Sequence, residues 1–249
     1  MEVKVIGSGS MWTKYNSASY IIDNRVVVDF PNGMCKYLFR ANVDPRNISH
    51  VILTHFHGDH YFDIPFFLML KAKSDNNKVN IYCSKEGKRK IRKLLKLGFP
   101  NSTKGILNDV DLTYIYDDKF KIFDYDISKI LVDHGRMKPA YGYIVEKNNK
   151  RIGFTGDCTL CNSAKYMAKT CDYLFCDCMF IKGTTKHMGI DMLKELVKEN
   201  DKCKYIVSHL DDETRADLIK QKIKNVIVPE DSQIIEIVWL RKVFCYNAL

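Results

Sequence analysis

Short apolar runs alternate along the chain with segments whose apolar positions recur at helical spacing. Runs rich in β-branched and aromatic residues, bounded by turn residues, are typical of strands. We therefore predict strands over residues 3–7, 18–22, 25–29, 51–54, 79–83, 111–116, 119–123, 129–133, 141–146, 150–155, 173–177, 204–208, 226–228 and 234–238. The helical spacing predicts helices over residues 62–73, 85–97, 161–169, 190–199 and 212–222. Early hairpins followed by alternating strands and helices indicate an α/β domain in which helices cover sheets.

The chain shows no internal boundary. No stretch rich in Pro, Gly or Ser divides it, and it contains no repeat, so we predict a single domain over residues 1–249. A membrane span needs roughly 18 apolar residues in a row, and no run approaches that length. The first residues also lack the apolar core of a signal peptide. We expect a cytoplasmic protein that makes no contact with a membrane.

Nine cysteines support the same compartment. Their number is odd and several lie in apolar strand-like runs, whereas a disulfide scaffold is usually shorter and rich in loops. We therefore expect reduced thiols. Cys158 and Cys161 have C-x-x-C spacing, but no second such pair completes a zinc ribbon. We interpret both as ordinary buried thiols and keep a redox or metal role as the alternative.

The positive charge of the chain is concentrated in one segment. The chain has 39 Lys and Arg against 30 Asp and Glu, a formal net charge of +9. Residues 71–104 hold eleven basic and two acidic residues, and the remainder holds 28 of each sign. The predicted helix over residues 85–97 has one apolar face and one basic face. This segment could bind an anionic small molecule or a nucleic acid as substrate. The alternative is a solvated helix face.

A cluster of histidine and aspartate residues follows the predicted strand over residues 51–54. His55, His57, Asp59 and His60 come within six positions, directly after an apolar run. Burying so many polar groups beside a core strand is unfavourable unless a partner satisfies them. Imidazole and carboxylate groups are standard ligands of zinc, iron and manganese. A catalytic metal usually takes about three protein ligands, so four in one turn indicate two metals about 3.5–4 Å apart.

This His-x-His-x-Asp-His motif resembles that of the metallo-β-lactamase superfamily. Further segments follow in the order of the family's motifs, and they end at His134, Asp157 and His209. The resemblance covers nearly the whole chain. It implies a metallo-β-lactamase-like αβ/βα sandwich, with two mixed β-sheets flanked by helices.

The resemblance also implies a ligand set for two metals. The first metal would be held by His55, His57 and His134, the second by Asp59, His60 and His209, and Asp157 would bridge them.

Within the superfamily, the later segments resemble the ribonuclease Z-like branch. Asp177 stands where a glutamate is usual, and His187-Met-Gly189 stands where His-x-Thr is usual. In that branch the carboxylate–histidine pair supports proton donation to the leaving oxygen. The resemblance therefore implies the same catalytic role for His187 and Asp177; alternatively, His187 caps the helix that follows it.

One departure from ribonuclease Z concerns the substrate. Ribonuclease Z carries a long tRNA-binding arm between its third and fourth motifs. The interval between His134 and Asp157 is short here, and the predicted strands over residues 141–146 and 150–155 fill it. The chain therefore resembles the branch without its arm, which argues against maturation of tRNA 3′ ends.

The site predicts a binuclear metal-dependent hydrolase, with a phosphodiesterase favoured. A metal-bound hydroxide would attack the phosphodiester, and Asp59 would orient or deprotonate the attacking water. One alternative is hydrolysis of a lactone, thioester or β-lactam on the same metal site, and another is a mononuclear iron dioxygenase of the same superfamily. We expect two divalent ions, with zinc favoured over manganese or iron. The sequence leaves the oligomeric state open, with a homodimer as one alternative.

Overall fold

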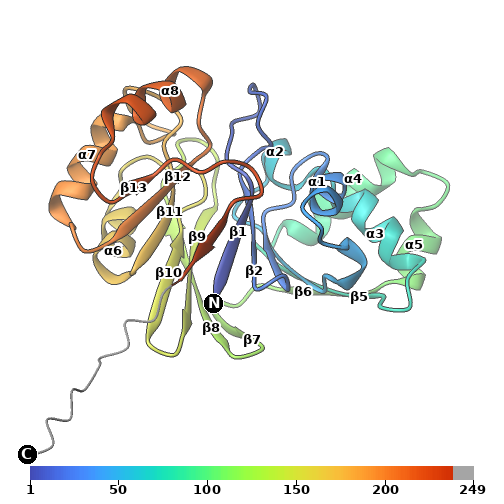
Figure 1. Ribbon diagram of the computed structural model, residues 1–249. Coiled ribbons are helices and arrows are strands. Elements are labelled where there is room, and N and C mark those ends of the chain that lie inside the picture. The colour runs from blue at the N-terminus through green and yellow to red at the C-terminus, as the bar shows by residue number, and fades with distance from the viewer. Residues whose placement is uncertain (238–249) are drawn as a thin grey trace, which may run out of the picture.

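The computed structural model describes residues 1–237 as two β-sheets packed face to face, with helices on both outer faces (Figure 1). Each sheet has seven strands and combines parallel with antiparallel pairs. The first sheet has the order β14 (Ile234–Glu236), β1 (Glu2–Gly7), β2 (Ser19–Ile22), β3 (Val26–Val28), β4 (His50–Ile52), β5 (Lys78–Tyr82) and β6 (Asp111–Ile115). The second has the order β13 (Val226–Ile227), β12 (Lys204–Ser208), β11 (Tyr173–Asp177), β10 (Lys150–Phe154), β9 (Ala140–Lys147), β8 (Tyr125–Val132) and β7 (Lys119–Ile122).

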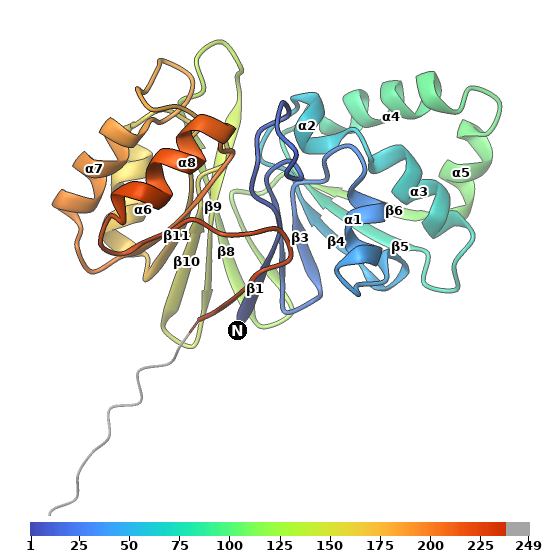
Figure 2. The ribbon, with the colours of Figure 1, turned by 45° about the horizontal axis from the view of Figure 1, so that its top comes forward.

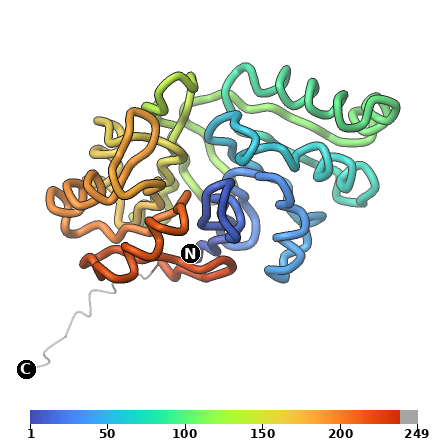
Figure 3. The backbone as a smooth tube through the Cα atoms, turned by 90° about the horizontal axis from the view of Figure 1, so that it is seen from above, coloured from blue at the N-terminus to red at the C-terminus, as the bar shows by residue number. Residues whose placement is uncertain are grey.

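Helices from the first half of the chain cover the first sheet, and later helices cover the second (Figure 2). The first group is α1 (Met34–Arg40), α3 (Ile64–Ala72), α4 (Gly87–Gly98) and α5 (Thr103–Asp109). The second group is α6 (Asn162–Thr170), α7 (Ile190–Glu199) and α8 (Asp212–Gln221). Two short helices, η1 (Pro45–Asn47) and α2 (Gly58–Tyr61), lie in connections of the first half. Seen from above, the blue-to-cyan half and the orange-to-red half lie side by side (Figure 3).

The predicted α/β sandwich of two mixed sheets with flanking helices is confirmed. The helix predicted over residues 190–199 has the same ends in the structure, and the other four predicted helices are present with shifted ends. The helices α1, α2, α5 and η1 were not predicted. The strand predicted over residues 129–133 begins earlier, at Tyr125, because its first residues pair with β7. The last predicted strand ends at Glu236 within the described residues, and residue 238 lies outside them.

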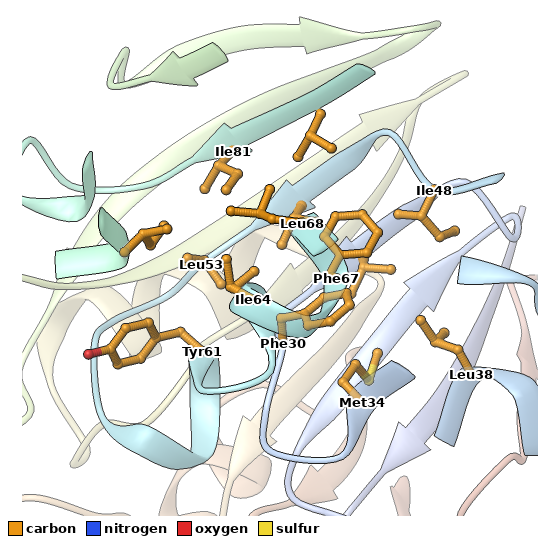
Figure 4. Packing of buried hydrophobic residues seen from close by; sticks show 14 of the residues in the cluster. Phe30, Met34, Leu38, Ile48, Leu53, Tyr61, Ile64, Phe67, Leu68 and Ile81 are labelled. Carbon is orange, nitrogen blue, oxygen red and sulfur yellow. The ribbon is translucent and has the colours of Figure 1, made fainter. Parts of the chain in front are cut away.

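Apolar side chains form a layer on each side of each sheet. Between the sheets, Tyr20 packs against Phe154 and Phe175, with ring centroids 5.1 Å apart in both pairs. Between the first sheet and its helices, Phe30 and Phe67 pack together within a cluster that also contains Met34 (Figure 4). A third cluster joins the second sheet to α6, α7 and α8. These layers hold the strand ends in fixed positions.

Several strands end at the same edge of the sandwich. In the second sheet, β10, β11 and β12 run parallel, and β8 shares their direction because β9 is antiparallel to both β8 and β10. In the first sheet, β3, β4 and β5 run parallel. Side chains that follow these strands therefore meet where the loops of the two sheets come together.

Among the residues that the structure describes, no helix is long and apolar enough to cross a membrane.

Candidate metal centre

The predicted histidine-rich motif forms the connection between β4 and α2. His55 and His57 precede α2, and Asp59 and His60 lie within it. His55, Asp59 and His60 are buried, whereas His57 is half-buried. In Figure 2, α2 lies at the border between the two halves of the sandwich. The motif therefore faces the second sheet from the first.

Residues that follow strands of the second sheet complete the cluster. His134 follows β8, Asp157 follows β10 and His209 follows β12, and all three are buried. Gly156, before Asp157, has φ +59°, and a Cβ there would come within 2.8 Å of the Thr54 Cβ. Only glycine fits this turn, which brings the Asp157 carboxylate against the first sheet.

Three imidazoles converge on one side of Asp157. The His57 Nδ1 atom lies 3.0 Å from His55 Nε2 and 3.1 Å from His134 Nε2. Burial lowers the pKa of all three histidines, so their rings are neutral. Nitrogens bound to one tetrahedral zinc ion at about 2.0–2.1 Å are expected to lie roughly 3.3 Å apart. This group can therefore hold one metal ion, with Asp157 as a fourth ligand.

Asp59, His60 and His209 form a second group on the other side. The Asp157 Oδ2 atom lies 3.3 Å from His60 Nε2 and 3.2 Å from His209 Nε2. The Asp59 Oδ2 atom lies 3.3 Å from His209 Nε2. Asp157 thus contacts both groups, which is the position of a bridging ligand.

The charges around Asp157 fit a bound cation. Burial lowers the pKa of His60 and His209, but neighbouring carboxylates raise it by more, to about 9 for His209. The two imidazoles thus hold protons beside Asp157 where a metal ion would supply the positive charge, and metal binding would release those protons. Buried atoms without a hydrogen-bond partner in the described chain include Asp59 Oδ1, His60 Nε2 and His209 Nδ1. Such atoms are unfavourable without a ligand.

Two residues that support the site, Asp29 and Thr54, were not predicted as part of it. Asp29 accepts hydrogen bonds from the Thr54 backbone N–H at 2.8 Å and the Thr54 hydroxyl at 2.7 Å. Its Oδ2 atom also lies 2.8 Å from His60 Nδ1, which orients the His60 ring with Nε2 toward Asp157. Asp29 and His209 both have positive φ, at 60° and 58°. Strained backbone of this kind is often found at functional sites.

Replacing Asp29 with asparagine is expected to weaken zinc binding by about 10–100-fold. An amide cannot accept all three hydrogen bonds as a carboxylate does, so the His60 ring loses its fixed orientation. Zinc titration against a competing chromophoric chelator measures the change. The matched control is Asp44→Asn, which alters a surface carboxylate bound to Arg46. Equal zinc affinity in Asp29→Asn and wild type would contradict the role of Asp29.

The structure also brings the predicted catalytic pair to the cluster. His187 Nδ1 lies 2.8 Å from Asp177 Oδ2 and 4.0 Å from Asp157 Oδ2, and its ring stacks on that of His209. Burial lowers the pKa of His187, but the hydrogen bond and charge of Asp177 raise it by more, so the net shift is upward. His187 does not cap α7, whose N-cap residue is Gly189. It is close enough to Asp157 and His209 to serve alternatively as a ligand.

All nine predicted site residues thus lie in one cluster, which contains six of the seven histidines in the chain. A model of the family described as Anti-Pycsar protein Apyc1 matches residues 1–232. The chain belongs to this family. It is a metallo-β-lactamase-fold protein related to ribonuclease Z, so the resemblance read from the motifs is confirmed.

Three similar proteins share between 17% and 29% of the aligned residues with this chain. Ribonuclease Z of Thermococcus kodakarensis is 29% identical over 130 residues, which cover 52% of this chain and 40% of that protein. The match thus spans less than half the length of that relative. The metallo-β-lactamase-fold protein YhfI of Bacillus subtilis has a TM-score of 0.77 at 17% identity, covering 94% of this chain and 99% of YhfI. A diphosphatase of the PhnP family has a TM-score of 0.75 at 18% identity, covering 94% and 97%. The two structures establish the fold.

Proposed function

We propose that this chain is a binuclear metal-dependent phosphodiesterase. The observation that carries the proposal is the His187–Asp177 pair beside the shared Asp157 carboxylate. An alkoxide leaving from a phosphodiester is a strong base that needs a proton, and a histidine held protonated by a carboxylate supplies one. A carboxylate leaving group of an ester or lactone needs such an acid far less. The pair therefore favours phosphodiester over acyl substrates.

The two groups around Asp157 would hold the metals, as His55, His57 and His134 on one side and Asp59, His60 and His209 on the other. When bound, two divalent ions, zinc in our proposal, supply Lewis acidity that lowers the pKa of water to about 7 and polarises phosphoryl oxygens.

Asp59 is placed to act on the attacking water. Burial raises its pKa, but the hydrogen bond from His209 and the charge of His60 lower it by more, so the carboxylate is ionised. Its Oδ1 atom has no hydrogen-bond partner among the described residues. That oxygen can orient a water and accept its proton, while His187 donates a proton on the leaving side.

The similar proteins support this reaction class. Ribonuclease Z and the PhnP-family diphosphatase are both named as enzymes that cleave bonds to phosphorus. Between His134 and Asp157 this chain has the hairpin of β9 and β10 in place of an arm. We therefore propose a phosphodiester other than a tRNA precursor as substrate.

Metal quantification combined with one hydrolysis panel tests the proposal. The panel contains a bis-aryl phosphate, cyclic nucleotides, RNA, a lactone, a thioester and a β-lactam. We expect about two zinc ions per chain and turnover of at least one phosphodiester. Turnover confined to the lactone, thioester or β-lactam would replace the proposal with acyl hydrolysis. One iron per chain with oxygen consumption would replace it with a dioxygenase.

We further propose that part of the basic segment binds the anionic substrate. Between α2 and α4 lies a groove, called here the α2–α4 groove, lined by Phe56, Tyr61, Phe62, Arg89, Lys90, Lys93, Leu94 and Leu97. Phe56 lies between two ligands of the metal motif, and Lys90 lies over its ring at 5.0 Å. The groove shares Phe56 and Tyr61 with the segment that carries the metal motif, and it combines cations with an exposed aromatic ring, that of Phe62. Phosphates and bases are bound by these groups.

Not every charge of residues 71–104 belongs to this surface. Lys71 is fully buried, and its Nζ atom donates to the Arg46 carbonyl oxygen at 2.9 Å. Burial lowers the pKa of Lys71 to about 8. This lysine stabilises the fold and cannot contact a substrate.

Reversing the charge of Arg89 and Lys93 together is expected to raise KM for RNA by about tenfold at low salt, with kcat little changed. The dependence of log(kcat/KM) on log salt concentration should flatten by roughly 0.7 for each phosphate contact removed. The matched control reverses Lys73 and Lys104, two exposed lysines of the same segment outside the groove. Equal salt dependence in both double variants would show that the groove is a solvated surface.

A further inference from the structure

The loop between β10 and α6 carries two cysteines in contrasting environments. Cys158 is fully buried, whereas Cys161 is half-buried and lines an open surface pocket with Lys138 and Pro139. Cys158 precedes Cys161, the N-cap residue of α6, by only three positions. The C-x-x-C spacing thus keeps a buried thiol near one that solvent reaches.

Cys161 lies where a thiolate is stabilised. The hydrogen bond from Cys158, together with backbone N–H groups that include those of Ser163 and Ala164, lowers the pKa of Cys161 to about 5. Cys161 is also the N-cap residue of α6, and the N-terminal end of a helix favours negative charge. In contrast, burial raises the pKa of Cys35, the other half-buried cysteine among the described residues.

We propose that Cys158 and Cys161 form a reversible disulfide through which a peroxide switches off the neighbouring hydrolytic site. The effect on turnover rests on the phosphodiesterase function proposed above. The disulfide itself and its effect on metal binding do not.

The oxidation needs only a peroxide as co-reactant. The Cys161 thiolate attacks one peroxide oxygen and breaks the O–O bond, which gives a sulfenic acid and, after protonation, water. The Cys158 sulfur then attacks the sulfenyl sulfur, forms the S–S bond and releases a second water. The two thiols lose two electrons in total, which reduce hydrogen peroxide to water. A dithiol reductant reverses the change.

The backbone of Cys158 connects this pair to the site. Cys158 directly follows Asp157, the carboxylate shared by both ligand groups. Its backbone N–H donates to Asp177 Oδ2 at 3.1 Å, and its carbonyl oxygen accepts from the backbone N–H of Met188 at 2.9 Å. Met188 is adjacent to His187. A disulfide that displaces the Cys158 backbone therefore displaces Asp157 and the His187–Asp177 pair together.

The test uses the full chain, reduced and then treated with hydrogen peroxide. Remaining thiols are alkylated, and the disulfide is mapped by peptide mass spectrometry. We expect a Cys158–Cys161 disulfide, a fall of at least about tenfold in both zinc affinity and turnover, and recovery of both with dithiothreitol. Before oxidation, iodoacetamide should label Cys161 at least about tenfold faster than Cys35 near pH 6.5.

Two variants separate this effect from general oxidation. Cys161→Ser should keep its zinc affinity and turnover after peroxide, whereas Cys35→Ser should respond as wild type does. Absence of a Cys158–Cys161 disulfide in oxidised wild type would overturn the proposal. A disulfide that leaves zinc affinity unchanged would overturn its regulatory effect. If no substrate in the panel is turned over, the phosphodiesterase assignment fails, but disulfide mapping and zinc titration still decide the redox proposal.

Discussion

Replacing Asp157 with alanine is expected to lower turnover of a phosphodiester by at least about 10³-fold while the fold is retained. Among the described residues, Asp157 is the one carboxylate that contacts both ligand groups, and five imidazoles lie within 4.0 Å of its Oδ2 atom. Without it, neither group keeps its full set of ligands, and the imidazoles lose the charge that holds them together. The surrounding apolar layers do not depend on it.

The effect of Asp157→Ala is measured as the change in kcat/KM, in bound zinc per chain and in the circular dichroism spectrum. Bound zinc should fall below two ions per chain while the spectrum is unchanged. Asp133→Asn is the matched control, because Asp133 is an exposed carboxylate next to His134 that contacts no other ligand among the described residues. Turnover within about twofold of wild type in Asp157→Ala would exclude the bridging role.

Replacing His187 with alanine is expected to lower turnover by about 10²–10⁴-fold for a substrate with an alkoxide leaving group. For a nitrophenyl phosphodiester, whose leaving group is a stable anion, the fall should be less than about tenfold. The ratio of the two effects isolates proton donation from binding. His50→Ala is the control, since His50 bonds to Tyr82 away from the cluster. Equal losses on both substrates would indicate that His187 acts as a metal ligand.

The pH profile gives an independent test of the same pair. Proton donation requires the protonated imidazole, so the rate for the alkoxide substrate should fall as pH rises through the pKa of His187. Asp177 raises that pKa, and Asp177→Asn removes the negative charge. The fall should therefore move to lower pH in Asp177→Asn. An unchanged profile would contradict a role for the pair in proton donation.

Most of the fold could be predicted from the sequence because the core strands are continuous apolar runs. Of the helices that were not predicted, the two longest are α1 and α5, which each have seven residues and bury few side chains, such as Met34 and Leu38 in α1. Two turns offer too few positions to establish a helical period. The predicted helix over residues 85–97 was placed correctly because Ile91 and Leu95 form its buried face, although it begins at Gly87 without a side-chain cap.

The ligand groups could be predicted because their residue types are concentrated in motifs. The residues that hold these groups in place could not be predicted. Asp29 acts through Thr54 and His60, which are distant in sequence and meet it only in the folded sheet. The same limit applies to cysteines and lysines. Cys161 is not an ordinary buried thiol, and Lys71 is not a surface cation, because burial and neighbours decide both.

The proposed metal ligands come from both halves of the sandwich. His55, His57, Asp59 and His60 follow a strand of the first sheet, whereas His134, Asp157 and His209 follow strands of the second. A metal ion bound across this border favours the docked arrangement over any state in which the sheets separate. The free metal concentration in the surroundings would then set how firmly the two halves hold together. Metal supply would determine the lifetime of the folded chain as well as its chemistry.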